Sequence, residues 1–259
     1  MITIIRSEER EYADVKDQKT WKTFGPENKP GRFKDSFGVL KILNEEILSP
    51  GGGFTLHTKK DMVVVTYVRD GMIVYKCHLE EPVIFEMKEF GRNNADKETT
   101  QYAFNTSETE EAHIFQCGFN LDGCADACGD DAPKTKGVKK LFTHAERQGV
   151  LKLIASGDGK DDSLPIQQDV QIYSSYTRDG NHIVHELKPN RSAWFHVVKG
   201  EVLHNKVHLR TGDGAGLTEE TAVSFTSKGP AEILIFDLCE TKAEEKEHSP
   251  SERGAVATR

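Results

Sequence analysis

The chain has 259 residues, of which 29% are charged and 36% are hydrophobic, and its formal net charge is −8. A chain of this length can bury one large hydrophobic core or two ordinary ones. Its Lys and Arg residues are not clustered. Direct nucleic-acid binding is therefore not a leading function, because phosphate recognition needs concentrated positive charge.

The sequence also lacks the features of a membrane or secreted protein. Its apolar runs are shorter than the ~20 residues that a membrane-spanning helix needs, and the first apolar run is too short for a signal peptide. Five cysteines, an odd number, fit reduced thiols better than a disulfide framework. We therefore expect a cytoplasmic protein that binds neither membrane nor nucleic acid.

Short runs of β-branched and aromatic residues, separated by Gly, Asp, Asn and Pro, recur along the chain. Many of them alternate apolar and polar residues, as a strand with one buried face does. We predict strands at residues 63–68, 72–79, 83–87, 113–119, 150–155, 170–176, 182–187, 194–198, 201–204, 222–226 and 232–238. A capping-box spacing predicts one short helix over residues 143–148. Many short strands with tight turns indicate an all-β sandwich or barrel.

A coarse internal repeat indicates two similar barrels in tandem. His57 precedes the Gly71 turn by 14 residues, His185 precedes the Gly200 turn by 15, and the two turns are 129 residues apart. The predicted domains are an N-terminal barrel over 1–130, a linker with the short helix over 131–148, a C-terminal barrel over 149–240, and a mobile charged tail over 241–259.

A glycine-rich turn at residues 51–53 leads into a strand that carries His57. This layout is typical of a metal-binding β-barrel in which one strand directs imidazoles inward. Alternate residues of a strand share a face, so a second inward histidine would stand two residues later. Lys59 occupies that position.

Several ordered segments resemble motifs of the pirin family of two-barrel cupins. Residues 53–62 read Gly-Phe-x-x-His-x-Lys-Lys-Asp-Met, against Gly-Phe-x-x-His-x-His-Lys-Asp-Met in the family. The other matching segments are 20–24, 37–46, 157–169, 194–200 and 234–238. The resemblance implies an all-β bicupin, that is, two tandem antiparallel β-barrel domains of the jelly-roll (cupin) type.

The resemblance also implies a site for Fe(II) or another divalent metal in the N-terminal barrel. The family builds it from a His-x-His pair and a His-x-Glu pair, a donor set that suits such metals. The aligned residues here are His57, Lys59, Gln101 and Ala103. Only His57 retains a ligand-type side chain, a charged Lys59 would repel a cation, and Ala103 has no donor. We therefore expect no metal and no other cofactor at this site.

These four residues have functional and structural interpretations, which the sequence leaves open. His57 is either a pocket acid, base or donor toward a bound molecule, or a buried histidine satisfied by a neighbour such as Gln101. Lys59 either contacts an anion or carbonyl group inside the pocket, or extends from the barrel mouth into solvent. For Gln101 and Tyr102 the favoured interpretation is ordinary strand packing. The alternative is that Gln101 and Ala103, in place of a His and a Glu, lower the polarity of the barrel and leave room for a small apolar ligand.

Two further clusters permit a metal interpretation. Cys117, Cys124 and Cys128 could hold zinc, although their spacing fits a loop with free thiols better. The C-terminal barrel contains five histidines, which could form a relocated metal site but fit packing and surface positions better. They are His182, His185, His196, His204 and His208.

Three functions follow from the sequence. We favour a bicupin without dioxygenase activity that binds a small molecule in its N-terminal barrel or acts as a regulator through a protein partner. The alternative is a metal-dependent, quercetin 2,3-dioxygenase-like oxidoreductase of the pirin type. A third function is a metal-free enzyme in which Lys59 is the amine base or nucleophile, which would need burial of that amine.

Overall fold

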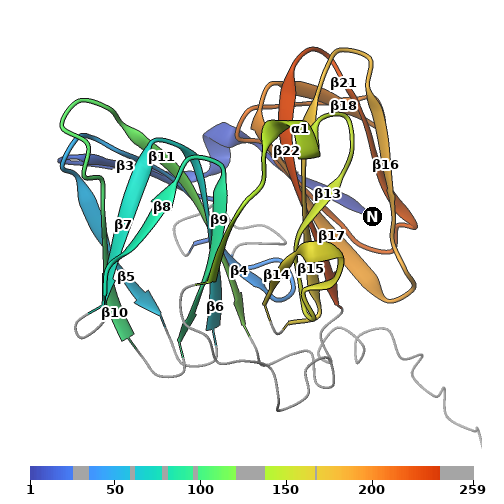
Figure 1. Cartoon of the computed structure of the whole chain (residues 1–259). Coiled ribbons are helices and arrows are strands. Elements are labelled where there is room, and N and C mark those ends of the chain that lie inside the picture. The colour runs from blue at the N-terminus through green and yellow to red at the C-terminus, as the bar shows by residue number, and fades with distance from the viewer. Residues whose placement is uncertain are drawn as a thin grey trace, which may run out of the picture.

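The structure is a computed structural model of the chain (Figure 1). It describes residues 1–25, 35–58, 62–77, 81–95, 99–120, 138–166 and 168–239, with the backbone alone at 56–58, 77, 93–95 and 99. Across these residues, no helix has both the length and the apolar character that crossing a membrane would require. The chain folds into two halves, each of them a pair of facing sheets whose strands are antiparallel except for the parallel pair β13 (Lys152–Ser156) and β14 (Leu164–Pro165).

The N-terminal half has a seven-stranded and a four-stranded sheet. The larger sheet has the order β12 (Val138–Leu141), β9 (Glu89–Ala95), β6 (Met62–Asp70), β11 (Ala112–Asn120), β4 (Leu40–Leu48), β3 (Gln18–Lys22) and β2 (Glu11–Val15). The smaller sheet has the order β5 (Gly53–Thr58), β10 (Thr99–Phe104), β7 (Met72–Cys77) and β8 (Val83–Glu86). The chain passes repeatedly between the two sheets, as in a jelly roll.

The C-terminal half repeats this arrangement. Its larger sheet has the order β1 (Ile2–Ile5), β20 (Gly214–Leu217), β17 (Arg191–Lys199), β22 (Ala231–Cys239), β15 (Val170–Thr177), β13 (Lys152–Ser156) and β14 (Leu164–Pro165). The smaller sheet has the order β16 (His182–Glu186), β21 (Ala222–Ser227), β18 (Glu201–His204) and β19 (Val207–Arg210). The predicted all-β bicupin architecture is confirmed.

The helices are short. They are η1 (Ser7–Glu9), α1 (His144–Arg147) and η2 (Lys160–Asp162). The predicted capping box at α1 is confirmed, since the Thr143 side chain accepts from the backbone N–H of Glu146, and the Glu146 side chain in turn accepts from the backbone N–H of Thr143.

The same glycine turn recurs in both halves, as the internal repeat predicts. Gly71 joins β6 to β7 with φ of 77°, and Gly200 joins β17 to β18 with φ of 93°. A Cβ on Gly71 would lie 2.6 Å from the Glu111 carbonyl oxygen, and one on Gly200 would lie 2.3 Å from that of Pro230. Both the left-handed backbone and the close approach therefore require glycine here.

Each half borrows a strand from outside its predicted sequence range. Strand β1, expected in the N-terminal barrel, pairs with β20 of the C-terminal sheet. Strand β12, expected in the linker, pairs with β9 of the N-terminal sheet. The two halves are therefore intertwined at their outer strands, and a cut at the predicted linker would separate β1 from its sheet. The predicted tail over 241–259 lies outside the described residues.

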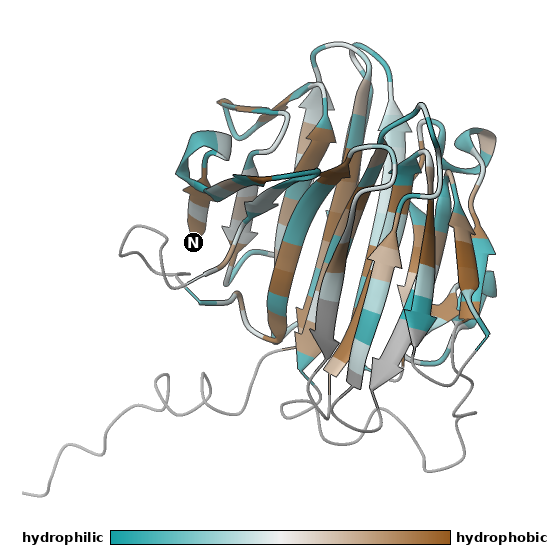
Figure 2. Ribbon diagram, turned by 90° about the vertical axis from the view of Figure 1, so that its left-hand side faces the viewer, coloured by the Kyte–Doolittle hydropathy of each residue, from teal (hydrophilic) through white to brown (hydrophobic). Residues whose placement is uncertain are grey.

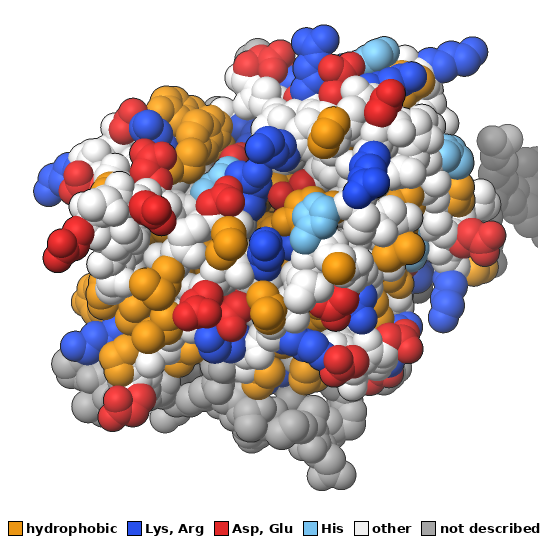
Figure 3. All heavy atoms as spheres, turned by 45° about the horizontal axis from the view of Figure 1, so that its top comes forward, with side chains coloured by type: hydrophobic (Ala, Val, Ile, Leu, Met, Phe, Trp, Pro, Cys, Tyr) orange, Lys and Arg blue, Asp and Glu red, His pale blue; other side chains and the backbone are white. Residues whose placement is uncertain are grey.

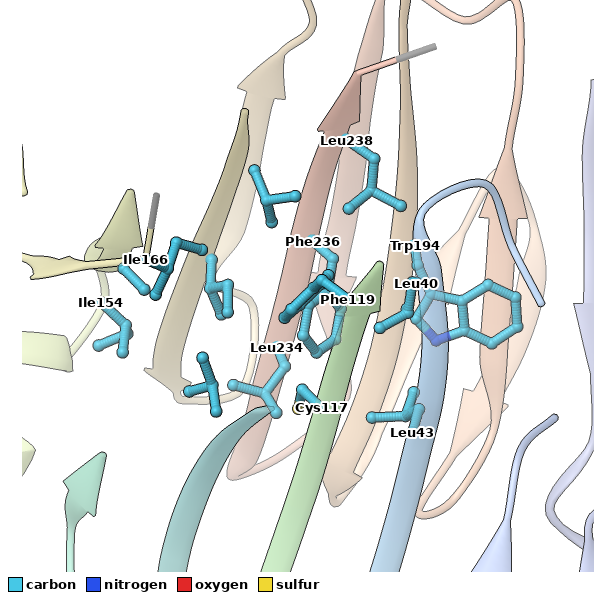
Figure 4. Packing of buried hydrophobic residues seen from close by; sticks show 14 of the residues in the cluster. Leu40, Leu43, Cys117, Phe119, Ile154, Ile166, Trp194, Leu234, Phe236 and Leu238 are labelled. Carbon is cyan, nitrogen blue, oxygen red and sulfur yellow. The ribbon is translucent and has the colours of Figure 1, made fainter. Parts of the chain in front are cut away.

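The two larger sheets face each other and bury the main hydrophobic core between them (Figure 4). Trp194 is fully buried there, with its ring centroid 5.1 Å from that of Phe24 and 5.5 Å from that of Phe37. Because these sheets are covered on both faces, their central strands are almost continuously apolar. All nine residues of β22 are buried. Figure 2 shows hydrophobic residues interspersed with polar ones along the strands that face its viewer.

A buried polar network also joins the two halves. Arg147 of α1 has no exposed surface and pairs with Glu232 of β22 at 3.3 Å. Glu232 also pairs with Arg69 of β6 at 3.2 Å and accepts a hydrogen bond from the Tyr67 hydroxyl. The guanidinium of Arg147 lies 4.2 Å from the ring centroid of Tyr176. Because both charges of such a pair are removed from water, each needs the other to offset its loss of hydration.

Candidate functional site

Ala103 lies on the inner face of the four-stranded sheet of the N-terminal barrel. It is 1% exposed and is directly opposite Phe54 of β5 on one side and Tyr75 of β7 on the other. The rings of Phe54 and Tyr75 meet edge to face, with centroids 6.4 Å apart. The methyl group of Ala103 therefore occupies a position between two aromatic residues, and it offers no ligand atom.

Gln101 lies two residues before Ala103 on β10, so the two side chains are on the same face of the strand. It is partly buried and lies opposite Leu56 of β5 and Cys77 of β7. Tyr102, between them, is 52% exposed, as expected for a strand whose alternate residues face solvent. The Gln101 amide can accept or donate a hydrogen bond, but its oxygen is a neutral and weak metal ligand.

The backbone of His57 pairs with Thr100 on β10. In this register His57 is directly opposite neither Gln101 nor Ala103, whose partners on β5 are Leu56 and Phe54. The side chain of His57 is not described, and Lys59 lies outside the described residues. A pocket shared by all four positions stays a prediction.

The interior of this barrel contains a hydrogen-bonded polar group. The Tyr75 hydroxyl, in a side chain that is 4% exposed, accepts a hydrogen bond from Nε2 of Gln116 at 3.1 Å and shares one with Oγ1 of Thr66 at 3.0 Å. Burial raises the pKa of Tyr75 well above its ordinary value. Phe85 packs edge-on against the Tyr75 ring at 5.3 Å. The neutral Tyr75 is thus fixed from three sides.

Glu46 is an ionisable group in the interior of the N-terminal barrel. It lies on β4 opposite Ile114 and is 3% exposed, and Nε2 of Gln18 donates to its Oε2 at 3.3 Å. Burial raises the pKa of Glu46 to about 7. Near neutral pH the carboxyl group is therefore divided between its two protonation states and can either donate or accept a hydrogen bond.

The sequence prediction missed Glu46, Tyr75, Gln116 and Thr66 as site residues. Period-two alternation would have placed Glu46 inward, because it stands two residues before the buried Leu48 on the same strand. Sequence spacing alone could not have brought Tyr75 to Gln116 and Thr66, which come from three different strands.

The residues aligned with the family's ligands do not fit Fe(II). Ala103 has no donor and is flanked by aromatic rings, and Gln101 supplies a neutral amide where an imidazole is needed. Elsewhere, no group of three or more His, Cys, Asp or Glu residues within the described part of the chain is arranged to hold a metal.

The predicted cysteine cluster is only partly described. Cys117 is a free cysteine, 3% exposed, in the core between the barrels. Burial raises the pKa of its thiol well above the ordinary value, which makes it a poor ligand and nucleophile. Cys124 and Cys128 lie outside the described residues, so the zinc interpretation stays untested.

The five histidines of the C-terminal barrel have separate environments. His182 contacts Thr226, His185 contacts Asp237, His204 contacts the Ser224 carbonyl, and His208 contacts Glu201. His196 is fully buried beside Phe115, without a hydrogen bond to any described residue, and burial lowers its pKa to about 3. The packing and surface interpretation fits these contacts better than a shared metal.

Comparison with known proteins agrees with this architecture. The quercetinase C-terminal cupin domain matches residues 153–238. The chain is 28% identical over 240 residues to quercetin 2,3-dioxygenase of Escherichia coli K12, covering 92% of this chain and 99% of that protein. It is 28% identical over 205 residues to a pirin-like protein of Caulobacter vibrioides, covering 78% of this chain and 84% of that protein.

Solved structures show the same similarity over both barrels. YhhW from Escherichia coli superposes with a TM-score of 0.81 at 27% identity, covering 93% of this chain and 99% of that one. The bacterial pirin YhhW in complex with nickel(II) superposes with a TM-score of 0.79 at 27% identity, covering 93% and 100%. A relative with this fold thus binds a divalent metal.

Proposed function

We propose that this chain, a pirin-like bicupin, works without an iron centre in its N-terminal barrel, and that it binds a small molecule there or acts as a regulator rather than as a dioxygenase. The proposal rests on the residues that stand at the family's ligand positions. It concerns this chain alone, because the relatives it resembles are named as dioxygenases and one of them binds nickel(II).

The observation that carries the proposal is the environment of Ala103. A glutamate at this position would extend its carboxylate from between Phe54 and Tyr75, in a place that is 1% exposed. Such a charge needs a cation beside it to offset the loss of water. Alanine with two aromatic neighbours removes both the ligand and the need for the cation.

The same interior provides groups that can recognise an organic molecule. Phe54, Tyr75 and Phe85 form an apolar aromatic wall, and Glu46 and Gln116 supply hydrogen-bonding groups beside it. Ligand sites combine apolar walls with a few fixed polar groups in this way. The pocket residues proposed from the sequence, His57, Lys59, Gln101 and Ala103, would contribute to the same site.

Oxygen uptake with quercetin tests the proposal. With Fe(II) supplied, we expect the wild-type protein to consume no oxygen above the rate of a heat-denatured sample. The triple variant K59H/Q101H/A103E serves as the control that restores the family's ligand types. Quercetin-dependent oxygen uptake by the wild type, lost on His57→Ala, would contradict the proposal.

Ligand binding is tested separately from turnover. With quercetin as the probe, followed by fluorescence quenching without added metal, Ala103→Leu should weaken binding about tenfold or more by filling the pocket. Tyr102→Ala changes the neighbouring residue on the exposed face and should leave binding unchanged. Equal effects of the two changes would remove the N-terminal barrel as the ligand site.

The second candidate function is a metal-dependent quercetin 2,3-dioxygenase, and the names of the relatives favour it. Against it stand Lys59, Gln101 and Ala103. The metal-free alternative with Lys59 as base or nucleophile predicts that an imine formed with a carbonyl compound can be trapped at this lysine by reduction. Absence of labelled Lys59 after such trapping would eliminate it.

A protein partner and a cytoplasmic location also belong to this proposal. On the face shown in Figure 3, acidic and basic side chains are interspersed. That face does not present the single-sign basic patch that phosphate binding needs, which supports a partner other than nucleic acid.

A further inference from the structure

The C-terminal barrel contains a histidine–carboxylate pair that bridges its two sheets. Nε2 of His185, on β16 of the smaller sheet, lies 2.8 Å from Oδ2 of Asp237, on β22 of the larger sheet. The side chains of His185 and Asp237 are 12% and 5% exposed. The pair crosses the barrel interior close to the ends of both strands, so it lies at a mouth of the barrel.

Arg191 fixes the carboxylate of this pair. Its Nε donates to Oδ1 of Asp237, its Nη2 donates to the Asp237 carbonyl at 3.0 Å, and its Nη1 pairs with Asp169 at 2.8 Å. These bonds occupy the guanidinium, so Arg191 serves to orient and neutralise Asp237. The carboxylate is thereby held as a charged acceptor for His185.

This arrangement determines which ring nitrogen of His185 remains available. A neutral imidazole that faces a carboxylate through Nε2 must donate from Nε2, which leaves Nδ1 as an acceptor. No described residue forms a hydrogen bond with Nδ1 of His185. This nitrogen is also not completely buried. The acceptor is therefore open to a molecule that enters from solvent.

The surroundings of His185 are aromatic and apolar. The centroid of the Tyr173 ring lies 4.5 Å from the centroid of the His185 imidazole. The Tyr173 hydroxyl donates a hydrogen bond to Oε1 of Gln171 at 2.6 Å. Val223, directly opposite His185, is fully buried, and Leu187 is 8% exposed. A ring that enters here would meet apolar walls and one oriented acceptor.

We propose that this mouth of the C-terminal barrel is a second binding site, for a small hydroxylated aromatic compound. The ligand's hydroxyl group donates a hydrogen bond to Nδ1 of His185, and its ring packs against Tyr173. Asp237 and Arg191 are positioning residues that hold Nε2 of His185 against the carboxylate and so direct Nδ1 toward the ligand. The site is independent of the N-terminal barrel and of the function proposed for it.

Calorimetric titration with phenol and with anisole tests the site, because phenol keeps its hydroxyl proton at neutral pH and anisole lacks that donor. We expect the wild-type protein to bind phenol about tenfold more tightly or better, since a hydrogen bond to an oriented acceptor is worth that factor. His185→Phe should abolish the difference between the two compounds. His182→Phe changes an exposed histidine on the outer face of the same strand and should preserve it.

Equal affinity of the wild type for the two compounds, or a difference that survives His185→Phe, would overturn the proposal. A measurement on the unaltered protein guards against a variant that does not fold. Long-range ¹H–¹⁵N correlation of the histidine rings should show the Nδ1 resonance of His185 shifting when phenol is added and staying in place when anisole is added. An Nδ1 resonance that phenol leaves unchanged would overturn the site.

Discussion

Ala103 lies directly opposite Tyr75 across strands β10 and β7, so an aromatic ring stands beside the position where the pirin pattern has a glutamate. The Tyr75 hydroxyl is already hydrogen-bonded to the side chains of Gln116 and Thr66. The neighbours of Ala103 are therefore aromatic rings and a hydroxyl group that already has its hydrogen-bond partners. These neighbours support the proposal that the N-terminal barrel works without a metal.

Restoring the glutamate alone should destabilise the protein. Ala103→Glu places a charge, with no cation beside it among the described residues, in an interior that is 1% exposed at this position. This should lower the free energy of unfolding by about 3 kcal/mol at pH 8. Tyr102→Glu, on the exposed face of the same strand, should cost less than about 1 kcal/mol. Urea denaturation measures both, and equal losses would show that Ala103 does not lie in a closed interior.

The buried pair of Arg147 and Glu232 should contribute far more than a surface pair. Glu232→Gln leaves Arg147 without its buried counterion, and we expect a loss of about 3 to 5 kcal/mol in the free energy of unfolding. The matched control is Glu89→Gln, which removes the partner of the partly exposed Lys139 and should cost less than about 1 kcal/mol. If Glu232→Gln cost no more than the control, the network would not hold the barrels together.

Glu46 should make stability depend on pH between about 4.5 and 7. Burial raises its pKa from 4.5 to about 7, so the folded state binds the proton more tightly than the unfolded state. Its contribution is fully present below pH 4.5 and is lost as the pH rises to 7, in total about 3 kcal/mol. Glu46→Gln should remove this slope, as measured by urea denaturation at pH 5 and pH 8.

The neighbouring residue Glu45 also makes stability depend on pH, but over a different pH range from Glu46. Although burial opposes it, hydrogen bonding to His113 and Arg10 lowers the pKa of Glu45 to about 2. Its contribution is present above pH 4.5 and is lost as the pH falls toward 2. The windows of Glu45 and Glu46 do not overlap. Burial lowers the pKa of His196 from 6.5 to about 3, which adds a slope of opposite sign up to pH 6.5, so the test compares the variant with the wild type. Equal slopes between pH 5 and pH 7 in the wild type and in Glu46→Gln would refute the role given to Glu46.

Cys117 should be inert toward thiol reagents in the folded protein. Its side chain is buried between the barrels and burial raises its pKa, so iodoacetamide should label it only after denaturation. Peptide mass spectrometry of native and denatured samples measures this. Rapid labelling of Cys117 in the native state would mean that the core between the two larger sheets opens readily.

The sequence predicted the bicupin fold because alternation and glycine turns report local backbone geometry. The Gly71 and Gly200 turns illustrate this, since each adopts the conformation that only glycine tolerates well. The pairing of β1 with β20 could not be predicted in the same way. It joins Ile2 to Leu217, and nothing in either local pattern specifies a partner so distant along the chain.

The site was harder to predict for a similar reason. Family motifs drew attention to Gln101 and Ala103, but Glu46 and Tyr75 become site residues only when four strands are assembled. His185 was identified as a histidine of interest, yet its partner Asp237 is 52 residues away. Burial and long-range pairing, which create these groups, are properties of the folded sheets.

Metal content tests directly whether the N-terminal barrel works without a metal ion. The protein should be purified from cells supplied with iron, copper, nickel and zinc and analysed by inductively coupled plasma mass spectrometry, beside the variant K59H/Q101H/A103E. We predict well under one metal ion per chain in the wild type and a gain of metal in the variant. Near-stoichiometric metal in the wild type that is lost on His57→Ala would contradict the account.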